Sequence, residues 1–541
     1  MSAAGRRGAD ALARSWVQAG VGRVFTLSGN HVMPVFDAAL EAGVELIHVR
    51  HEAAAVHMAD AWARLTGEVG VALVTGGPGH ANAVGALYTA AMAESAVVLL
   101  SGHASNAQLG MGAFQEMRQA EIAAPLVKAA WVNDGAGKLA RDFAAAVRIA
   151  RSGRPGPVHM SLPTDSLEED AGDALVPGIG DFAPDPMTLD ENVARGMLQR
   201  LQEASRPMII AGPVCMTRDG RFRMAALEAA SGIPVVGMES PRGIGDPSLG
   251  AFAEVLAQAD CILLLAKRLD FTLKFGKPPA IAPECGFLQI DPDEAEIERT
   301  RSAVPSRLRA SAHAAAFAAM ATLTRIARPM KGVWLREVRA AIAYRPAAWD
   351  SAASRLPGRL HPVQALRPLQ ALLDSHPDSI FVSDGGEIGQ WAQACLDSPR
   401  RVINGVAGAI GAALPFAVAA RLAEPTAPVV AVMGDGTFGF HPAEIDTAVR
   451  YRLPFVAVVG NDARWNAEHQ IQLREYGPGR LIGLDLLPTR YDQVAVAFGG
   501  HGEQVTEAAE LMPAARRALA SGLPACVNVM IEGLAAPNIR R

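Results

Sequence analysis

The stretch "PVVAVMGDGTFGFHPAEIDTAVRYRLPFVAVVGND" (428–462) decides the fold of this chain. Two short runs rich in β-branched residues, 428–434 and 454–460, flank a helix-like stretch at 441–451. Such runs are typical of buried strands, and two strands joined through a helix run parallel in one sheet. The stretch therefore predicts part of a parallel sheet that is covered by helices.

Acidic residues follow both of these predicted strands. Asp435 lies between Gly434 and Gly436 after the first strand, and Asn461 and Asp462 follow the second. Parallel sheets bind ligands beyond the carboxyl ends of their strands, and glycines let the backbone approach an anion closely. Oxygen ligands suit Mg²⁺, which usually completes its shell with phosphate oxygens and water. A Gly-Asp-Gly tripeptide alone is most often a tight turn, but the second strand end favours a Mg²⁺–diphosphate site.

The same plan occurs near the N-terminus. "GVALVT" (70–75) predicts a strand, 80–93 a helix and "AVVLLSG" (96–102) the next strand, which suggests a duplicated α/β domain. Further strands are predicted between these two regions at "PMIIAG" (207–212), "IPVVG" (233–237), "CILLLA" (261–266) and "GFLQIDP" (286–292). The expected fold class is α/β, with three doubly wound parallel-sheet domains.

Two irregular segments separate the three patterns. Residues 168–186 are rich in Gly, Pro and acidic residues, and 345–360 are similarly irregular. A chain of 541 residues is also too long for one hydrophobic core. We therefore place domains at residues 1–185, 186–350 and 351–541.

Composition narrows the class of protein. Half of the residues are hydrophobic and 19% are charged, as in soluble globular proteins. A net charge of −5 without a dense basic tract argues against a nucleic-acid partner.

The start of the chain has no apolar core typical of a secretory signal. The uncharged segment 402–420 is rich in Ala and Gly, which favours a buried loop and helix over a membrane span. Five scattered cysteines without a CxxC pair indicate buried thiols in a reducing cytoplasm.

The spacing in the opening stretch resembles a family signature. Gly-Asp-Gly, then 24 residues, then Asn-Asn is the motif of thiamine-diphosphate enzymes, and this chain matches it except for Asp462 at the second Asn position. The resemblance spans nearly the whole chain and points to the acetolactate synthase superfamily, which orders a pyrimidine-binding, a central and a diphosphate-binding domain. It implies thiamine diphosphate and Mg²⁺ as cofactors, bound by the first and third domains, with Asp435, Asp462 and Arg464 at the metal.

"RHEAAAVHMADAWAR" (50–64) resembles the stretch that carries the family's activating glutamate, here Glu52. The resemblance implies that Glu52 contacts N1′ of the aminopyrimidine, so that the 4′-imino group can deprotonate C2 of the thiazolium. Burial of a carboxyl group raises its pKa, which suits such proton transfer. The resemblance also places the cofactor between two subunits, with Glu52 from one chain and Asp435 from the other. It therefore implies a homodimer or homotetramer.

Other segments resemble the superfamily's active site. "LSGNH" (27–31) places His31 where it would line the site, and "FQE" (114–116) places Gln115 where it would hydrogen-bond intermediates, which makes both residues catalytic candidates. Ile410 would hold the cofactor in its bent shape. The cofactor-binding residues implied by the resemblance are Gly29, Asn30, Thr75, Pro78, Asn82, Gly386, Ile410, Gly434, Gly436, Thr437 and Ala467.

The substrate pocket resembles known members less completely. Benzaldehyde lyase carries aromatic residues where this chain has Thr164 and Gly389, and acetolactate synthases usually carry a tryptophan where Ile471 stands. "RLDFTLKFG" (268–276) resembles the central domain of 2-hydroxyacyl-CoA lyases and oxalyl-CoA decarboxylases, which can hold an adenine nucleotide. Acetolactate synthases hold FAD there, so FAD, ADP and no ligand all stay open.

The resemblance implies an enzyme that makes or breaks a C–C bond next to a carbonyl group of a small molecule. The favoured activity is acetolactate-synthase-like: decarboxylation of a 2-oxo acid such as pyruvate, followed by carboligation. One alternative is a lyase of 2-hydroxy ketones or 2-hydroxyacyl-CoA. Another is a non-catalytic regulatory homologue, against which the presence of Glu52, Gln115 and Asp435 argues.

Overall fold

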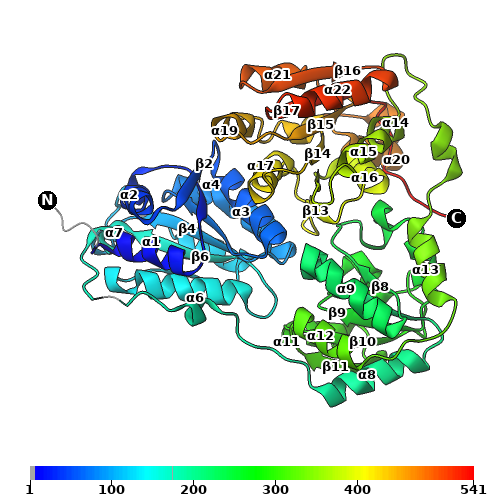
Figure 1. The fold of residues 1–541 in the computed structure, drawn as a ribbon, viewed down its shortest axis with the longest axis horizontal. Helices are drawn as coiled ribbons and strands as arrows, with labels where there is room; N and C mark the ends of the chain where they lie inside the picture. The colour runs from blue at the N-terminus through cyan, green and yellow to red at the C-terminus, as the bar shows by residue number, and fades with distance from the viewer. Residues whose placement is uncertain (1–5, 174) are drawn as a thin grey trace. The chain divides into compact units, whose positions relative to one another are not determined.

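The computed structural model of the chain describes residues 6–173 and 175–541, and it contains three parallel sheets with helices around them (Figure 1). The predicted α/β class with three doubly wound sheets is confirmed. Two compact units are distinguished, and each is described by itself. The first comprises the residues up to 185 together with 418–423 and 446–451, and the second comprises the rest.

The N-terminal sheet has the strand order β2-β1-β3-β4-β6-β5, with every neighbouring pair parallel. Its strands are β1 Arg23–Thr26, β2 Glu45–His48, β3 Gly70–Val74, β4 Val97–His103, β5 Ala130–Val132 and β6 Val158–Pro163. Its helices are α1 Gly8–Gln18, α2 Met33–Ala42, α3 Glu52–Thr66, α4 Pro78–Met92, α5 Gln119–Ala123, α6 Leu139–Arg151 and α7 Thr164–Glu168. Apolar residues of α1, α2 and α6 pack on one face of the sheet, while α3 and α4 contact its strands from the other.

The central sheet has the order β11-β10-β9-β7-β8. Its strands are β7 Pro207–Ala211, β8 Val235–Gly237, β9 Cys261–Leu265, β10 Gly286–Asp291 and β11 Leu308–His313. Its helices are α8 Glu191–Glu203, α9 Arg218–Ser231, α10 Phe252–Leu256, α11 Glu294–Ala303, α12 Ala316–Ile326 and α13 Trp334–Ala343. Two separate apolar clusters form, one against α8, α9 and α12 and the other against α10 and α13, so the sheet is buried on both faces.

The C-terminal sheet has the order β13-β12-β14-β15-β17-β16, the same order as the N-terminal sheet when each is renumbered from one. Its strands are β12 Ile380–Ser383, β13 Arg400–Ile403, β14 Val429–Gly434, β15 Val456–Asn461, β16 His501–Val505 and β17 Ala525–Met530. Its helices are α14 Pro362–Leu366, α15 Gln370–Leu373, α16 Gly386–Cys395, α17 Ala413–Ala423, α18 Asp435–Phe438, α19 Glu444–Arg450, α20 Asn466–Tyr476, α21 Tyr491–Ala497 and α22 Ala508–Ala520. The repeated order supports the duplication that the sequence suggested.

Both terminal sheets change winding direction at one point, between β1 and β3 and between β12 and β14. The chain leaves these neighbouring strands toward opposite edges of the sheet, which opens a crevice at their carboxyl ends. The segments that follow β1, β3, β12 and β14 contain most of the candidate site residues. The fold thus positions these residues where such sheets bind ligands.

The expectations for the cysteines and for the uncharged segment 402–420 have different outcomes. Four of the five cysteines are buried thiols, but Cys395 is only half-buried, so the prediction that all are buried is wrong for that residue. Within the described ranges, no helix has the length and apolar content needed to cross a membrane. Residues 413–420 of the uncharged segment lie in α17 (Ala413–Ala423), as expected for its helical part.

Candidate active site

Asp435 and Asp462 follow neighbouring strands of the C-terminal sheet. β14 pairs with β15 in a register that sets Gly434 opposite Gly460, so both acidic residues leave the sheet at the same edge. Both are buried, with 3% and 6% of their surface exposed. Burial raises the pKa of Asp435 to about 6, and burial together with the charge of Asp435 raises the pKa of Asp462 to about 7. Two buried carboxylates this close are costly without a cation, so this donor set fits Mg²⁺.

The backbone of Arg464 completes the same edge. The residues on either side of it bond to the facing segment 484–486, at 2.8 Å each. Arg464 therefore turns its N–H the other way, where it donates to Asp435 Oδ2 at 3.2 Å. Within the described part of the chain no group of three or more His, Cys, Asp or Glu side chains could hold a metal. A cation here would thus need oxygens from a diphosphate, a carbonyl and water besides the two carboxylates.

Asn461 is the exception among the predicted oxygen ligands. Its side chain is fully buried, donates to Thr489 O at 3.0 Å and to Asn528 Oδ1 at 3.1 Å, and accepts from Ala463 N at 3.2 Å. These bonds tie β15 to β17 and to the turn that carries Asp462. The expectation that Asn461 and Asp462 both offer side-chain oxygens is wrong for Asn461, because its amide is committed to the scaffold.

The glycines of this edge keep space for a ligand and for an aromatic ring. A Cβ atom on Gly436 would lie 2.6 Å from the ring of Trp465, so only glycine fits there. Thr437 donates its hydroxyl to Gly434 O at 3.0 Å, which closes the turn after β14. Ala467 lies in the first turn of α20, directly after Trp465 and Asn466. The structure therefore places Gly434, Gly436, Thr437 and Ala467 at the ends of the neighbouring strands β14 and β15 or in the segments that follow them.

Asp384 holds the loop that carries Ile410. It follows β12 and is buried, and it accepts backbone N–H groups of Gly385, Gly411 and Ala413 at 2.7–3.1 Å. Burial raises the pKa of Asp384 to about 6 despite these donors. A Cβ atom on Gly385 would lie 2.8 Å from Ile410 Cγ2, so the two segments are in close contact. Sequence reasoning missed Asp384, although a strand followed by Asp-Gly-Gly repeats the pattern around Asp435.

Gly386 follows this contact and opens α16. Its φ of +75° lies in the left-handed region, where glycine is the favoured residue. The conformation turns the chain from Asp384 into the helix within two residues. Gly386 and Ile410 therefore both lie beside the β12–β14 crevice.

Glu52 is the first residue of α3 in the N-terminal unit. It is 8% exposed, and its Oε2 accepts a hydrogen bond from Asn82 Nδ2 at 3.1 Å. Asn82 lies in α4, which begins at Pro78, a favoured residue for the first helical position. The end of the Glu52 side chain also lies near Gly79, where a Cβ would come within 3.4 Å of Oε1. The structure thus joins three predicted residues, Glu52, Pro78 and Asn82, around the start of two helices.

His31 contacts the turn after β3 from the end of β1. Its Nδ1 lies 3.2 Å from Thr75 Oγ1, and its ring stacks on Phe114 with 5.9 Å between centroids. Burial lowers the pKa of His31, which favours the neutral ring. Gly29 packs against Thr75 so closely that a Cβ would lie 2.3 Å from that side chain. His31, Thr75, Gly29 and the adjoining Asn30 thus form one cluster at the β1–β3 crevice.

Gln115 is held in an unusual backbone conformation beside the same turn. Its φ is +57°, and a Cβ on Gly77 would lie 2.8 Å from its Cβ and carbonyl oxygen. Gly77 N in turn donates to Gln119 Oε1 at 2.7 Å, and Gln119 Nε2 donates to Gly102 O and to Ser161 Oγ. Left-handed conformations of non-glycine residues cluster at functional sites. Gln119, fully buried, is a supporting residue that sequence reasoning missed.

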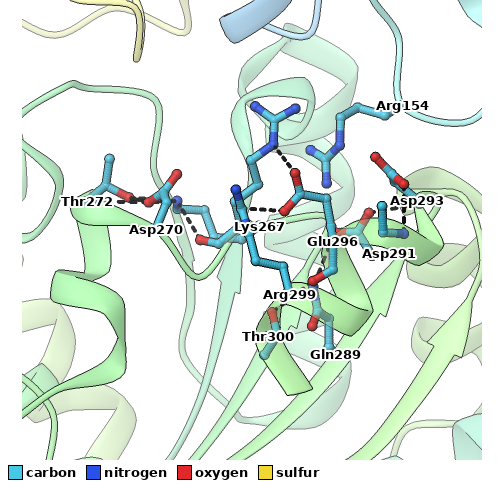
Figure 2. A network of polar contacts seen from close by, with 12 residues as sticks. Arg154, Lys267, Asp270, Thr272, Gln289, Asp291, Asp293, Glu296, Arg299 and Thr300 are labelled. Carbon is cyan, nitrogen blue, oxygen red and sulfur yellow. Dashed lines mark hydrogen bonds and ion pairs between the residues drawn. The ribbon is translucent and has the colours of Figure 1, made fainter. Parts of the chain in front are cut away.

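The carboxyl edge of the central sheet is occupied by its own charged side chains (Figure 2). Lys267 is 2% exposed and donates to Thr272 Oγ1 at 2.7 Å and to Asp270 Oδ1 at 3.2 Å. Burial opposes ionisation of Asp270, but Lys267 and Thr272 hold its pKa below the ordinary value. Arg268 donates to Glu296 Oε1 at 3.1 Å. A nucleotide phosphate at this edge would have to compete with these carboxylates for the cations.

Family models match all three regions of the chain. Residues 6–122 match the N-terminal TPP binding domain of thiamine pyrophosphate enzymes, 194–318 match the central domain and 384–529 match the C-terminal TPP binding domain. The first and third matches contain the two candidate half-sites described above. They support thiamine diphosphate as the ligand of the first and third domains.

Several named relatives match along nearly the full length of the chain. The chain is 32% identical over 532 residues to the acetolactate synthase large subunit IlvG of Mycobacterium tuberculosis, covering 96% of this chain and 95% of that protein. It is 30% identical to the acetolactate synthase large subunit of Parasynechococcus marenigrum, with 97% and 87% covered. It is also 29% identical to human 2-hydroxyacyl-CoA lyase 2, with 97% and 90% covered.

Proposed function

Because this chain belongs to the family of thiamine pyrophosphate enzymes, we propose that it decarboxylates a 2-oxo acid and joins the product to a second carbonyl compound, with Mg²⁺ as the metal. Two relatives named acetolactate synthase large subunits align with nearly the whole chain and support this reaction type. The proposed substrates are small aliphatic 2-oxo acids such as pyruvate.

Thiamine diphosphate, when bound, supplies a carbon nucleophile and an electron sink for C–C bonds next to carbonyl groups. In this proposal Glu52 holds and moves a proton at its buried carboxyl group, and Asn82 orients that group through the 3.1 Å hydrogen bond. The placement of Glu52 at the start of α3, close to Gly79 and hence to the turn after β3, supports this role. Its limited exposure also restricts proton exchange with bulk water.

The metal is proposed to bind Asp435, Asp462 and the carbonyl oxygen of Arg464. In an antiparallel bridge the N–H and C=O groups of one residue face the same side, and the N–H of Arg464 faces Asp435. Asp462 then serves in place of the usual asparagine and adds one negative charge. The diphosphate is proposed to lie along Gly434, Gly436 and Thr437, with Gly386 and Ile410 at the neighbouring crevice.

The observation that carries the acetolactate-synthase-like reaction is the placement of Gln115. Its left-handed backbone packs on Gly77, and the preceding Phe114 stacks on His31, so Gln115 and His31 lie beside the same turn. A positioned amide donor suits a developing oxyanion, which forms when a carbonyl group is attacked. Gln115 and His31 are therefore proposed to bind the substrate carbonyl and its product.

The packing of Gly389 argues against an aromatic substrate. A Cβ atom at this position in α16 would lie 2.0 Å from Asp384 O, so the backbone leaves no room for a side chain. Gly389 thus cannot provide the aromatic contact that its position suggests in benzaldehyde lyase. A missing aromatic contact costs about 1 kcal/mol beyond the lost area, which disfavours benzoin as a substrate.

A second candidate function is cleavage of a 2-hydroxyacyl-CoA, which the human relative's name supports. The central domain offers Arg268 and Lys274 for the phosphates of a CoA. Arg268, however, already pairs with Glu296. A CoA phosphate that took this arginine would leave the largely buried carboxylate of Glu296 without its cation, which is costly. The CoA route is therefore the weaker proposal.

The assembly is proposed to contain at least two chains, as a homodimer or homotetramer, with Glu52 of one chain completing the site around Asp435 of the partner subunit. A cytoplasmic location is part of the same proposal. FAD or ADP in the central domain would have to displace the internal partners of Lys267 and Arg268 at its sheet edge.

The test is a side-by-side assay of the purified protein with thiamine diphosphate and Mg²⁺ against pyruvate, benzoin and a 2-hydroxyacyl-CoA. We expect pyruvate consumption with CO₂ release to be fastest, with an acyloin or acetohydroxy acid as product. Fast cleavage of the CoA ester or of benzoin, with pyruvate untouched, would replace the synthase by the lyase. Binding of thiamine diphosphate without turnover of any substrate would indicate a regulatory homologue.

A further inference from the structure

A cavity of about 770 Å³ lies within the second unit and contains none of the candidate active-site residues. It is lined by α9, by the edge strand β8, by α13 and by the segment that runs from the end of α16 to Arg401. Its volume lies in the range of cavities that bind small organic ligands. The sequence patterns assigned no role to these residues.

The lining of this cavity carries an excess of positive charge. Five arginines face two carboxylates; the arginines are Arg221, Arg339, Arg345, Arg367 and Arg401, and the carboxylates belong to Glu228 and Asp397. Three of the arginines have close acidic partners: Arg339 pairs with Glu228, Arg367 with Asp350, and Arg401 with Glu239. The remaining two, Arg221 and Arg345, are the cations available to a ligand.

Arg345 has no carboxylate partner among the described residues. Its guanidinium donates only to backbone carbonyls, at 2.8–3.2 Å from Ser248, Ile342, Tyr344 and Ala394. These dipoles fix the position of the group, and the charges of Asp246 and Asp397 act on it without forming an ion pair. Burial lowers the pKa of Arg345, as expected for a cation held away from water.

Arg221 is compensated only weakly. Its Nη1 lies 3.8 Å from the carboxylate of Asp397, which is 76% exposed, and 3.3 Å from Ser398 O. Its Nε is buried and has no hydrogen-bond partner. Burial, and next the charge of Arg401, lowers the pKa of Arg221. An anion between these guanidinium groups would relieve both effects.

Two other buried polar atoms of the lining lack a partner, Ser248 Oγ and Gln393 Oε1. Buried polar atoms without partners are rare and point to a missing ligand or water. Apart from Gln370, the rest of the wall is apolar and includes Met224, Leu249 and Leu396. The cavity therefore offers cationic and polar groups for a charged head and an apolar surface for a body.

We propose that this cavity binds a small organic anion, with its carboxylate or phosphate group held by Arg221 and Arg345 and its apolar body against α9 and Leu249. The site is separate from the candidate active site and does not depend on the reaction proposed above. Arg401 also lines the cavity, and its pairing with Glu239 holds it in place.

The test is isothermal titration of the protein saturated with thiamine diphosphate and Mg²⁺, so that the active site is already occupied. The probes are phenyl phosphate, benzoate and inorganic phosphate. We expect the two aromatic anions to bind and inorganic phosphate to bind at least tenfold more weakly, because it lacks the apolar body. Arg221→Gln should weaken binding of phenyl phosphate about tenfold or more, as charge-assisted hydrogen bonds are lost.

Arg223→Gln is the matched control, because Arg223 lies on the same helix, pairs with Asp219 and does not line the cavity. It should leave the affinity unchanged. Ala225→Phe should block binding by filling the cavity without changing its charge, which tests the site even if Arg221→Gln unfolds. Failure of every probe to bind the wild type, or equal affinities in the wild type and Ala225→Phe, would overturn the proposal. Equal affinities for inorganic phosphate and phenyl phosphate would overturn the claim that an apolar body of the ligand contributes to binding.

Discussion

Asn82 Nδ2 donates a hydrogen bond to Glu52 Oε2 at 3.1 Å, from the first turns of α4 to the first residue of α3. The two helix starts therefore fix a buried carboxylate beside the turn that follows β3. Glu52→Gln should keep the fold, because glutamine has the same shape and can still bond to Asn82. Exchange of the C2 hydrogen of bound thiamine diphosphate should slow roughly 10²–10⁴-fold, the usual contribution of a positioned acid or base.

Hydrogen–deuterium exchange followed by NMR measures this rate directly. Glu45→Gln is a suitable control, since Glu45 is exposed and pairs with Arg23 at the far end of β2. In this variant the C2 hydrogen of bound thiamine diphosphate should exchange at the wild-type rate. An unchanged rate in Glu52→Gln would remove Glu52 from the mechanism.

The two carboxylates after β14 and β15 predict a requirement for Mg²⁺. Asp435→Ala should abolish Mg²⁺-dependent binding of thiamine diphosphate, because a hard anionic ligand beside the diphosphate is lost. A fluorescence titration with thiamine diphosphate measures this binding, and removal of Mg²⁺ with EDTA should release the cofactor from the wild type. Tight binding of the cofactor by metal-free wild type would contradict this account.

Asp462→Asn separates the charge of this residue from its position and belongs to the same metal prediction. The variant restores the usual family residue and removes one negative charge near the phosphate oxygens and Asp435. We expect equal or tighter binding of thiamine diphosphate in the presence of Mg²⁺. A severe loss of affinity in this variant would show that the carboxylate itself is required.

The hydrogen bonds that Asp384 accepts order the loop that carries Ile410, and we expect this order to affect the binding of thiamine diphosphate. Asparagine at this position has one acceptor oxygen, so Asp384→Asn would leave at least one of the three backbone N–H groups facing an amide NH₂. An unsatisfied buried donor costs roughly 1–3 kcal/mol. We expect a lower melting temperature and weaker binding of thiamine diphosphate, because the loop carrying Ile410 loosens. Asp374→Asn, on the surface, is the control, and an affinity equal to wild type in Asp384→Asn would refute the coupling.

Buried histidines of the N-terminal unit predict how stability depends on pH. Burial lowers the pKa of His80 to about 4 and that of His57 to about 3, and it lowers the pKa of His159 well below 6.5. As the pH falls below about 6.5, the unfolded chain binds protons at these residues while the folded chain does not. The free energy of unfolding should therefore fall by up to roughly 1.4 kcal/mol per pH unit for each residue.

Thermal unfolding between pH 7.5 and 4.5 checks this dependence. His80→Gln should make the fall in melting temperature less steep, because one of the three contributing groups is gone. His80 Nδ1 lies 2.9 Å from Ser101 Oγ, a contact that glutamine can also make. A steeper or unchanged pH dependence in the variant would contradict the assignment.

Much of the fold could be predicted because its strands are buried on both faces. The runs at 428–434 and 454–460 became β14 and β15 with ends shifted by one or two residues. The sequence reading left out β1, β2, β5, β6, β12, β13 and β17, as well as the edge strands β11 and β16. The partly exposed residues of these edge strands, such as those of "HGEQV" (501–505), lack a continuous apolar pattern. β8 is also an edge strand, but its residues are mostly buried and its apolar run was recognised.

The candidate site could be predicted where a motif lies at a strand end, and less well elsewhere. Asp435 and Glu52 follow directly from short motifs, and the structure places each beside the predicted neighbours. Asn461 was misassigned because its long-range bonds to Thr489 and Asn528 leave no mark on the local sequence. Gln119 was missed for the same reason, since its role depends on contacts with residues such as Ser161.

The most direct test of the proposed reaction is a ¹³C NMR spectrum of the protein with [2-¹³C]pyruvate, thiamine diphosphate and Mg²⁺. Carboligation of two pyruvate molecules with loss of CO₂ joins their two labelled carbons. The account predicts a product with a carbonyl and a carbinol signal, each split by one-bond ¹³C–¹³C coupling. Unchanged pyruvate signals from a protein that cleaves a 2-hydroxyacyl-CoA under the same conditions would contradict it.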